Sequence, residues 1–311
     1  MAGPAVWRAY NQCLPGWARY QGANGPLQHV CNVAVMFASL WPAGQRRGMM
    51  VFTRGDTDMR LMLLALSLIA TPLAAQQPAM TAPAGVAAPG YVANRPPLAL
   101  LRLLPPPPEA GSTEEQADKF LYRQSRRGIG RPLWQQAVAQ LSVTSPSFVK
   151  TLSCALGATL TPQTTPATMT LLRRAGADLA RGVNAAKDFY KRPRPFTTDN
   201  GKACDPDAAV DGGKALGFAY PSGHSAVGWL WGLILADVRP ERSAALLKFG
   251  KATGDLRIAC RVHWASDVTG GRLMATALYQ QIADAADYKA DLLKAKAELS
   301  LAPVPEGCPA S

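Results

Sequence analysis

The chain has 311 residues, of which 48% are hydrophobic and 17% charged, a composition typical of a globular protein with room for one or two domains. Its formal net charge is +12, which suits an anionic substrate, a nucleic acid or a membrane surface. The basic residues are spread along the chain and no nucleic-acid-binding motif occurs, so we expect no nucleic-acid binding.

The stretch 59–75 has the pattern of a secretory signal peptide: one arginine, a short apolar run and small residues at Ala74 and Ala75. The run is shorter than the ~20 apolar residues of a membrane-spanning helix, and Pro72 fits a cleavage region better than a helix interior. We therefore predict a periplasmic or secreted protein, with no membrane insertion once the signal is removed. Because a signal peptide begins a chain, we interpret residues 1–58 as an upstream extension that the mature protein lacks.

Residues 76–111 are rich in Pro, Ala and Gly, which predicts an extended arm rather than a domain. Helical signals dominate from there onward and alternating strand patterns are scarce. The predicted fold is therefore all-α, a single helical bundle over residues 112–300, followed by a C-terminal tail over 301–311.

Caps and periodicity place the individual helices. Thr113 and the two glutamates after it predict a capped start, and Thr161-Pro162 and Thr165-Pro166 each place a cap residue before a proline at the first helical position. Apolar residues recur at helical spacing from Ala167 to Tyr190, which predicts one buried face. The stretch 222–238 is apolar almost all round and predicts a central buried helix. Three further helices are predicted from Pro240 towards Arg257, from Ser266 to Asp284 and from Tyr288 to Leu299.

Four cysteines follow residue 75, namely Cys154, Cys204, Cys260 and Cys308. We expect one or two disulfides in an oxidising compartment, but four cysteines allow three complete pairings and the sequence does not choose among them. No Cys-x-x-Cys pair occurs, so a zinc site has no support. We expect neither a metal ion nor another cofactor.

Only two histidines follow residue 75, and each lies in a dense polar cluster. His224 belongs to Tyr220-Pro-Ser-Gly-His-Ser225, which opens the apolar helix. The backbone N–H groups and hydroxyl of Ser222 and Gly223, at the positive end of a helix, suit an anion and phosphate especially. On its own, this cluster is also explained by a simple helix cap beside an unrelated histidine.

The other histidine, His263, lies four residues before Asp267, and we expect the two on one helical face. A carboxylate bonded to one ring nitrogen would fix the tautomer and leave the other nitrogen as nucleophile or base. A third cluster holds Lys187 and Arg194, and Pro193 predicts that the long helix ends before Arg194 and leaves it on the turn beyond. Solvated ion pairing and a complemented helix dipole are the plain alternatives for these two clusters.

Together the three clusters favour phosphoryl transfer through a covalent phosphohistidine, because they supply several cations, a helix N-terminus, two histidines and one orienting carboxylate. Their order and spacing resemble the signature of the type 2 phosphatidic acid phosphatase superfamily: Lys-x6-Arg-Pro, Pro-Ser-Gly-His and Ser-Arg-x5-His-x3-Asp. More narrowly, the chain is similar to the class A bacterial non-specific acid phosphatases. That similarity covers about residues 100–299 and includes Leu104-Pro-Pro-Pro-Pro108 with Gly111-Ser112, the Tyr220 run, and His263-Trp264 with Ser266-Asp267-Val268.

The resemblance implies an all-α acid phosphatase that hydrolyses small phosphomonoesters of broad range at acidic pH without a metal, with phosphotransferase activity on the side. It implies that His263 is the nucleophile, that Asp267 orients it, and that His224 is the general acid and then the base that activates water. It also implies five residues that bind the phosphate: Lys187, Arg194, Ser222, Gly223 and Arg257. Relatives are commonly oligomeric, so a homodimer or larger homo-oligomer is implied as well.

Two residues depart from the family pattern. Leu256 stands where Ser or Asn usually precedes the arginine, so one hydrogen bond is expected to be missing. Arg261 stands where glycine is common, and this side chain would either crowd the pocket or add a cation. Both departures concern substrate range and rate more than reaction type.

Three other classes of protein compete with this interpretation. Vanadium-dependent haloperoxidases share the residue set because vanadate mimics phosphate, but the compact length and the class A features favour a phosphatase. An integral lipid phosphatase would carry several spanning helices, which the sequence after residue 75 does not offer. A non-catalytic periplasmic phosphate-binding protein would not need a His–Asp pair placed against a second histidine.

Overall fold

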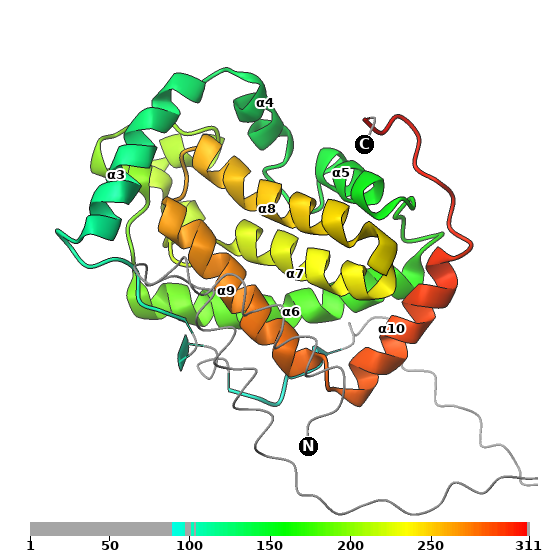
Figure 1. Cartoon of the computed structure of the whole chain (residues 1–311). Helices are drawn as coiled ribbons and strands as arrows, with labels where there is room; N and C mark the ends of the chain where they lie inside the picture. The colour runs from blue at the N-terminus through cyan, green and yellow to red at the C-terminus, as the bar shows by residue number, and fades with distance from the viewer. Residues whose placement is uncertain (1–88, 97–100, 103, 310–311) are drawn as a thin grey trace, which may run out of the picture. The chain divides into compact units, whose positions relative to one another are not determined.

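The fold is organised around helix α7 (Gly223–Val238), which packs against α6 (Pro166–Tyr190), α8 (Ser243–Ala259) and α9 (Ala265–Ile282) (Figure 1). The α7 sequence is apolar on every side, and its buried residues are distributed around the helix rather than along one stripe. The predicted central buried helix is therefore confirmed.

The computed structural model describes residues 89–96, 101–102 and 104–309, all within one compact unit of the chain that spans 79–311. The predicted signal peptide, 59–75, and upstream extension, 1–58, lie outside the described residues. Within the described part, the chain forms α-helices, 3-10 helices and turns but no β-strand, so the all-α prediction is confirmed. No helix among these residues has the length and apolar character needed to cross a membrane.

Further helices complete the bundle around α7. They are α3 (Thr113–Ser125), α4 (Pro132–Ala139), α5 (Pro146–Leu156) and α10 (Ala286–Leu299). Short 3-10 helices lie in the connections, namely η2 (Arg126–Gly128), η3 (Pro195–Thr198), η4 (Pro206–Ala209), η5 (Asp211–Leu216) and η6 (Pro240–Arg242). Helices α3 and α4 lie towards one end of the bundle and α10 towards the other (Figure 1).

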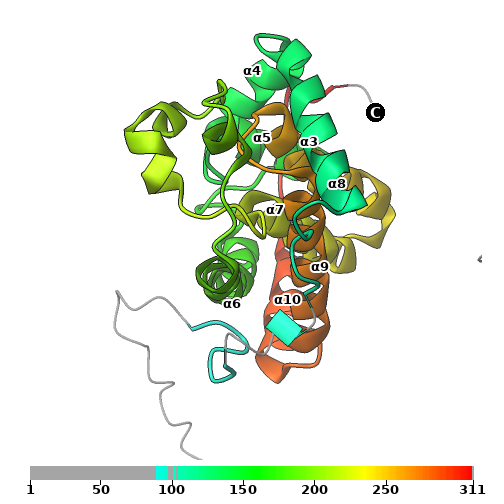
Figure 2. The ribbon, with the colours of Figure 1, turned by 90° about the vertical axis from the view of Figure 1, so that its left-hand side faces the viewer.

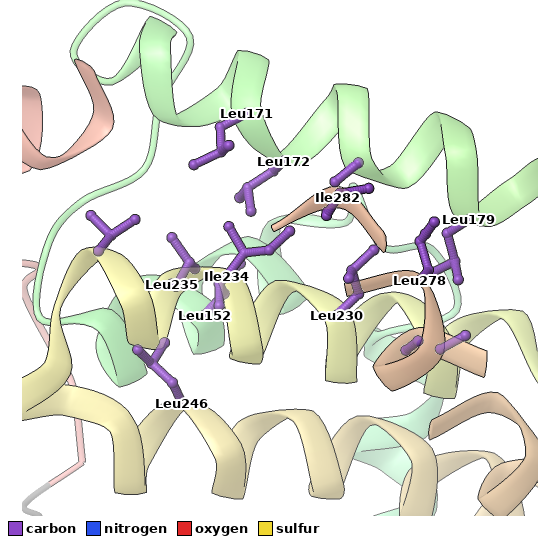
Figure 3. Packing of buried hydrophobic residues seen from close by; sticks show 14 of the residues in the cluster. Leu152, Leu171, Leu172, Leu179, Leu230, Ile234, Leu235, Leu246, Leu278 and Ile282 are labelled. Carbon is purple, nitrogen blue, oxygen red and sulfur yellow. The ribbon is translucent and has the colours of Figure 1, made fainter. Parts of the chain in front are cut away.

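The long helix α6 buries the apolar face that its periodicity predicts. Figure 3 shows Leu171, Leu172 and Leu179 directed towards the neighbouring helices. The side chains they face include Leu230, Ile234 and Leu235 of α7 and Leu278 and Ile282 of α9. Full burial of one such leucine contributes roughly 1.5–3 kcal/mol relative to exposure. This packing fixes the position of α6, and with it the cations at the end of that helix.

Glycines let α7 approach α8 and α9 closely. A Cβ atom on Gly250 would lie 2.9 Å from the carbonyl oxygen of Gly228, and one on Gly271 would lie 2.5 Å from that of Ser222. Real Cβ atoms do not make backbone contacts this short, so only glycine allows the observed spacing. The close approach brings the N-terminus of α7 against the first turn of α9 and the last turns of α8.

Several predicted helix boundaries need correction. Helix α3 is capped by Ser112, whose hydroxyl accepts from the N–H of Glu115, rather than by Thr113. Thr161-Pro162 does not start a helix, because the Thr161 hydroxyl closes a turn with Thr164 and helix α6 begins only at Pro166. Helices α4 and α5 were not individually predicted; both are short and begin at a proline.

Two disulfides join the four cysteines, Cys154 to Cys308 and Cys204 to Cys260. The first attaches the tail to α5, beside a hydrogen bond of 2.8 Å from Thr159 N–H to the Pro303 carbonyl. The second attaches the segment before η4 to the end of α8. The expectation of disulfides is confirmed, and the pairing that the sequence left open is now chosen.

Candidate active site

The predicted site residues come from four helix ends that meet on one side of the molecule. Lys187 lies in the last turn of α6 and Arg257 in the last turns of α8, while His224 and Asp267 lie in the first turns of α7 and α9. The C-terminal ends of α6 and α8 and the N-terminal ends of α7 and α9 share the left-hand side of the view in Figure 1, and this side faces the reader in Figure 2. Arg194 follows the end of α6 on the next turn, as Pro193 predicted.

His263 and Asp267 form a buried pair at the N-terminus of α9. His263 Nδ1 lies 3.3 Å from Asp267 Oδ2, and the same oxygen accepts from the Trp264 N–H at 2.8 Å. Helix α9 begins after Trp264, so His263 precedes the helix and the expectation of a shared helical face is wrong. The carboxylate instead reaches back across the helix N-terminus, where it also satisfies a free backbone donor.

The second ring nitrogen of His263 carries a lone pair. Nε2 lies 3.2 Å from Arg194 Nη1, and a guanidinium group has only donors, so Nε2 must accept. The ring proton therefore lies on Nδ1 and points at Asp267. Burial, followed by the charges of Arg194 and Lys187, holds the pKa of His263 well below its usual value. This environment favours the neutral ring, with Nε2 free to act as a nucleophile.

Three buried or half-buried cations lie close enough to this ring for their charges to act on it, and none of them has a carboxylate partner among the described residues. Arg194 donates to the carbonyls of Val262 and Gly217 at 2.8 and 2.9 Å, and Lys187 donates to the carbonyl of Phe218. Arg257 donates to one carbonyl in α4, and its Nε has no partner among the described residues. Within the described part of the chain, none of the three cations forms an ion pair.

Burial is the main cause that lowers the pKa of each cation, to about 8 for Lys187 and to about 10 for Arg194 and Arg257. All three remain charged at acidic and neutral pH. Hydrogen bonds to backbone carbonyls orient the three cationic side chains without neutralising their charge. The site therefore has a concentrated positive potential that suits an anion.

His224 lies beside the same cations. Its Nε2 is 2.8 Å from the carbonyl oxygen of Leu141, so Nε2 carries the proton of the neutral ring and Nδ1 is the atom that gains a second proton. Burial, and then the charge of Arg257, lowers the pKa of His224 to about 4. The charge of His224 also lowers the pKa of His263. The structure thus brings the two imidazoles into one electrostatic environment.

The predicted anion-binding turn lies at the start of α7. Ser222 is the N-cap residue and is fully buried, and its N–H donates to the Asp267 carbonyl at 3.0 Å. Gly223 and His224 open the helix, so their N–H groups have no intrahelical acceptor. All eight predicted site residues are therefore brought to one end of the bundle.

The two departures from the family pattern have different outcomes. Leu256 is buried in an apolar cluster with Trp134 and Phe196 and offers no hydrogen bond. Arg261 neither crowds the site nor adds a cation to it, because its side chain turns towards α3, donates to the Tyr122 carbonyl at 2.7 Å and stacks over the Tyr122 ring. Arg261 also has a φ of +67°, in the left-handed region that favours glycine.

The sequence did not identify two residues that support Asp267, one by direct contact and one through the other. Arg192 donates to Asp267 Oδ1 at 2.5 Å and to Asp118 Oδ2 at 2.8 Å. Arg192 lies in the basic run at the end of α6, where its spacing gave no reason to separate it from its neighbours. Asp118 lies on α3, far from the motifs in sequence, and only the packing of α3 against α9 brings it here.

Comparison with known proteins agrees with this geometry. A family model described as the PAP2 superfamily matches residues 167–287, a range that contains every predicted site residue. A non-specific acid phosphatase of Salmonella typhimurium is 32% identical over 201 residues, which cover 63% of this chain and 78% of that protein. One from Providencia stuartii is 32% identical over 216 residues, 68% of this chain and 84% of its own. An acid phosphatase of Zymomonas mobilis is 32% identical over 202 residues, 65% and 76% of the two chains.

The chain belongs to the PAP2 superfamily, and its all-α fold is consistent with that family. Within it, the chain belongs to the class A bacterial non-specific acid phosphatases. The resemblance inferred from the three motifs is confirmed.

Proposed function

We propose that this acid phosphatase hydrolyses phosphomonoesters through a covalent bond between phosphorus and Nε2 of His263. One observation carries the proposal: the Nε2 lone pair faces Arg194, with Lys187 and Arg257 nearby and no carboxylate partner for any of the three in the described part of the chain, while Asp267 holds the proton on the other ring nitrogen. A nucleophile fixed in one tautomer beside an electropositive pocket is suited to attack on a phosphoester.

In the first step, His263 Nε2 forms a bond to phosphorus and the bond from phosphorus to the leaving oxygen breaks. Lys187, Arg194 and Arg257 hold the phosphoryl oxygens together with the α7 N-terminus at Ser222 and Gly223. These groups stabilise the negative charge that develops on the oxygens. Protonated His224 gives its Nδ1 proton to the leaving oxygen, so the alcohol departs neutral.

In the second step, His224 is neutral and accepts a proton from water at Nδ1. The water oxygen bonds to phosphorus as the bond between phosphorus and His263 breaks. Inorganic phosphate leaves, and both histidines return to their starting states. Asp267 accepts a hydrogen bond from Nδ1 throughout and stabilises the positive charge that His263 carries as the phosphohistidine.

Trapping of the intermediate tests this mechanism. Rapid acid-free quenching of the protein with a radiolabelled phosphate ester should leave label that is stable in base and lost in acid, the behaviour of a phosphohistidine. The matched control is His263→Ala, which should carry no label and show no turnover. Label on the control protein, or label that is lost in base and kept in acid, would contradict His263 as the nucleophile.

Chelation and vanadate separate the competing activities. Hydrolysis of p-nitrophenyl phosphate should persist in excess EDTA, because no step above requires a metal. Bromide oxidation that appears only with added vanadate would favour the haloperoxidase alternative instead, and phosphate binding without turnover would favour a binding protein.

The cellular context is part of the proposal. Two disulfides and relatives among bacterial acid phosphatases are compatible with an extracytoplasmic location. We propose that the signal peptide at 59–75 directs export to the periplasm or beyond, so that N-terminal sequencing of exported protein should start near residue 76. The family resemblance supports a homo-oligomer, which light scattering on the purified protein would test.

A further inference from the structure

We propose that Arg192, which Asp118 orients, acts as a positioning residue that holds the Asp267 carboxylate behind His263 and favours its anionic form. The inference rests on the proposed role of His263. It concerns two residues that have no place in the phosphate pocket and that the three sequence motifs do not identify.

Arg192 bridges two buried carboxylates. Its Nη1 lies 2.5 Å from Asp267 Oδ1 and its Nη2 lies 2.8 Å from Asp118 Oδ2. The side chains of Arg192, Asp118 and Asp267 are 10%, 3% and 0% exposed, so solvent does little to screen these contacts. Because Oδ1 of Asp267 is held by Arg192, Oδ2 is left to face His263 Nδ1 and the Trp264 N–H.

Asp118 is itself fixed against the first turn of α9. Its Oδ1 accepts from the Ser266 N–H at 2.9 Å, and its Oδ2 accepts from the Ser266 hydroxyl. Arg192 Nη1 also donates to the Ser266 hydroxyl oxygen at 2.7 Å. The network therefore joins three segments that are distant in sequence: α3, the turn after α6, and the start of α9. The guanidinium plane cannot rotate without breaking contacts to both carboxylates.

The partners of Arg192 distinguish it from the phosphate-binding cations. Lys187, Arg194 and Arg257 bond to neutral carbonyls, whereas the charge of Arg192 is matched by two carboxylates. The two carboxylates offset the positive charge of Arg192, so Arg192 attracts a phosphate oxygen only weakly. It acts on the reaction through Asp267 and not through the substrate.

The charged and titratable groups around Asp267 explain why it needs this partner. They come from several elements and comprise Arg192, Asp118, His263, Lys187, Arg194 and Tyr220. The pKa of Asp267 is raised to about 6, mainly by burial and also by the negative charge of Asp118, while Arg192 is the largest cause that opposes this rise. Without Arg192, two buried carboxylates would lie close together with no cation between them.

The loss of Arg192 should change the pKa of Asp267 in a definite direction. The pKa of Asp267 would rise above its present value of about 6, so the carboxyl group would stay protonated up to a higher pH than in the wild type. A neutral Asp267 no longer stabilises the charge on the phosphohistidine. The loss would be largest at low pH and would shrink as the pH rises and the carboxyl group ionises again.

Steady-state kinetics of Arg192→Gln and Asp118→Asn test the inference. For Arg192→Gln with p-nitrophenyl phosphate, kcat should fall about 10- to 100-fold at acidic pH, and the acid limb of the kcat profile should move up by about 1–3 pH units. KM and the inhibition constant of inorganic phosphate should change by less than about threefold, because the phosphate pocket is intact. Arg192→Lys should return the acid limb towards its original position, since it restores the positive charge.

The matched control is Arg126→Gln, which removes another arginine from an ion pair of 3.2 Å, with Asp199, at an exposed position after α3. Its kcat and pH profile should equal those of the wild type. The inference would be overturned if kcat of Arg192→Gln fell by the same factor at every pH. A rise in KM and in the phosphate inhibition constant would also overturn it. Should Arg192→Gln fail to fold by circular dichroism, the isosteric Asp118→Asn still decides. It removes a negative charge that raises the pKa of Asp267, so its acid limb should move to lower pH, and an unchanged acid limb also overturns the inference.

Rapid-quench measurement of phosphoenzyme formation separates this inference from the mechanism on which it rests. If the wild-type protein forms no phosphohistidine, the proposed mechanism fails. If the wild type forms it and Arg192→Gln forms it at the same rate at every pH, only the positioning role fails.

Discussion

At the scale of single residues, the protonation of His224 depends on what lies in the pocket. Its pKa of about 4 reflects burial and the neighbouring charge of Arg257, so in the free protein the ring is mostly neutral above that pH. A bound phosphoester places negative charge beside the ring and offsets the cations, which raises the pKa of His224 in the complex. Substrate binding would thus prepare the proton donor that the proposed first step needs.

This coupling predicts a separation between two pH profiles. The base limb of kcat/KM reports groups of the free protein and the base limb of kcat reports those of the complex. We therefore expect the base limb of kcat/KM to lie at lower pH than that of kcat, and both to be shifted or lost in His224→Ala. Coincident limbs would indicate that another group supplies the proton.

His224→Ala should also discriminate between leaving groups. Loss of a general acid costs about 10²- to 10⁴-fold when the leaving oxygen must be protonated. An alkyl phosphate needs that proton, whereas p-nitrophenolate leaves as an anion, so kcat should fall far more for the alkyl ester. Equal losses on both esters would argue against the acid role of His224.

The sequence predicted which residues gather at the candidate site better than it predicted the residues around them. His263, Asp267 and Arg194 lie in compact motifs whose spacing is itself informative. Asp118 offers no such signal, because one aspartate on an amphipathic helix is ordinary until α3 is placed against α9. The same limit applies to Arg261, whose direction is set by its left-handed backbone and by Tyr122 rather than by any pattern in the chain.

At the scale of elements, the glycines between α7 and α8 set the spacing of two helices that carry site residues. Gly250→Ala would place a methyl group 2.9 Å from the Gly228 carbonyl oxygen and 3.1 Å from the Trp229 Cα, both backbone atoms that cannot rotate away. We expect a loss of about 1–3 kcal/mol in the free energy of unfolding. Because α7 carries His224 and α8 carries Arg257, kcat/KM should fall as well.

Urea unfolding followed by circular dichroism measures that loss. Gly128→Ala is the matched control, because a methyl group there meets no atom within 4 Å and the backbone is not left-handed. Its stability should be unchanged or slightly raised. A Gly250→Ala protein as stable as this control would show that α7 and α8 can separate without cost.

Helices were predicted correctly where one pattern of apolar residues continued over many positions. The buried face of α6, from Leu171 to Val183, and the all-apolar α7 are long enough for periodicity to decide. Helices α4 and α5 have only 8 and 11 residues, too few for a period to stand out from the surrounding loops. The false start at Thr161 arose because a threonine before a proline also suits a turn.

At the scale of the whole molecule, the two disulfides close chain segments of different kinds. Cys154 and Cys308 are separated by 154 residues, and Cys154 lies beside Arg242, at the end of α8 opposite Arg257. Cys204 and Cys260 are separated by 56 residues, and Cys260 follows Arg257 by one helical turn. We therefore expect the first bridge to contribute to stability alone, and the second also to hold the segment that carries Arg257 in place.

Paired serine substitutions should separate these roles. Cys154→Ser with Cys308→Ser should lower the free energy of unfolding by about 2–5 kcal/mol with kcat/KM unchanged, because a constraint on the unfolded chain is lost. Cys204→Ser with Cys260→Ser should lower stability and also raise the KM for p-nitrophenyl phosphate. Equal kinetic effects of the two pairs, measured beside their urea transitions, would contradict this division.

Lys187, Arg194 and Arg257 have no carboxylate partner among the described residues, and this affects how the proposed catalytic cycle ends. In the proposed mechanism, inorganic phosphate keeps the oxygens that these cations bind in the ester, so the same interactions hold the product. Each proton that the departing phosphate takes up removes one negative charge and loosens that grip. An acidic medium thereby shortens the stay of the product and frees the enzyme for its next turnover.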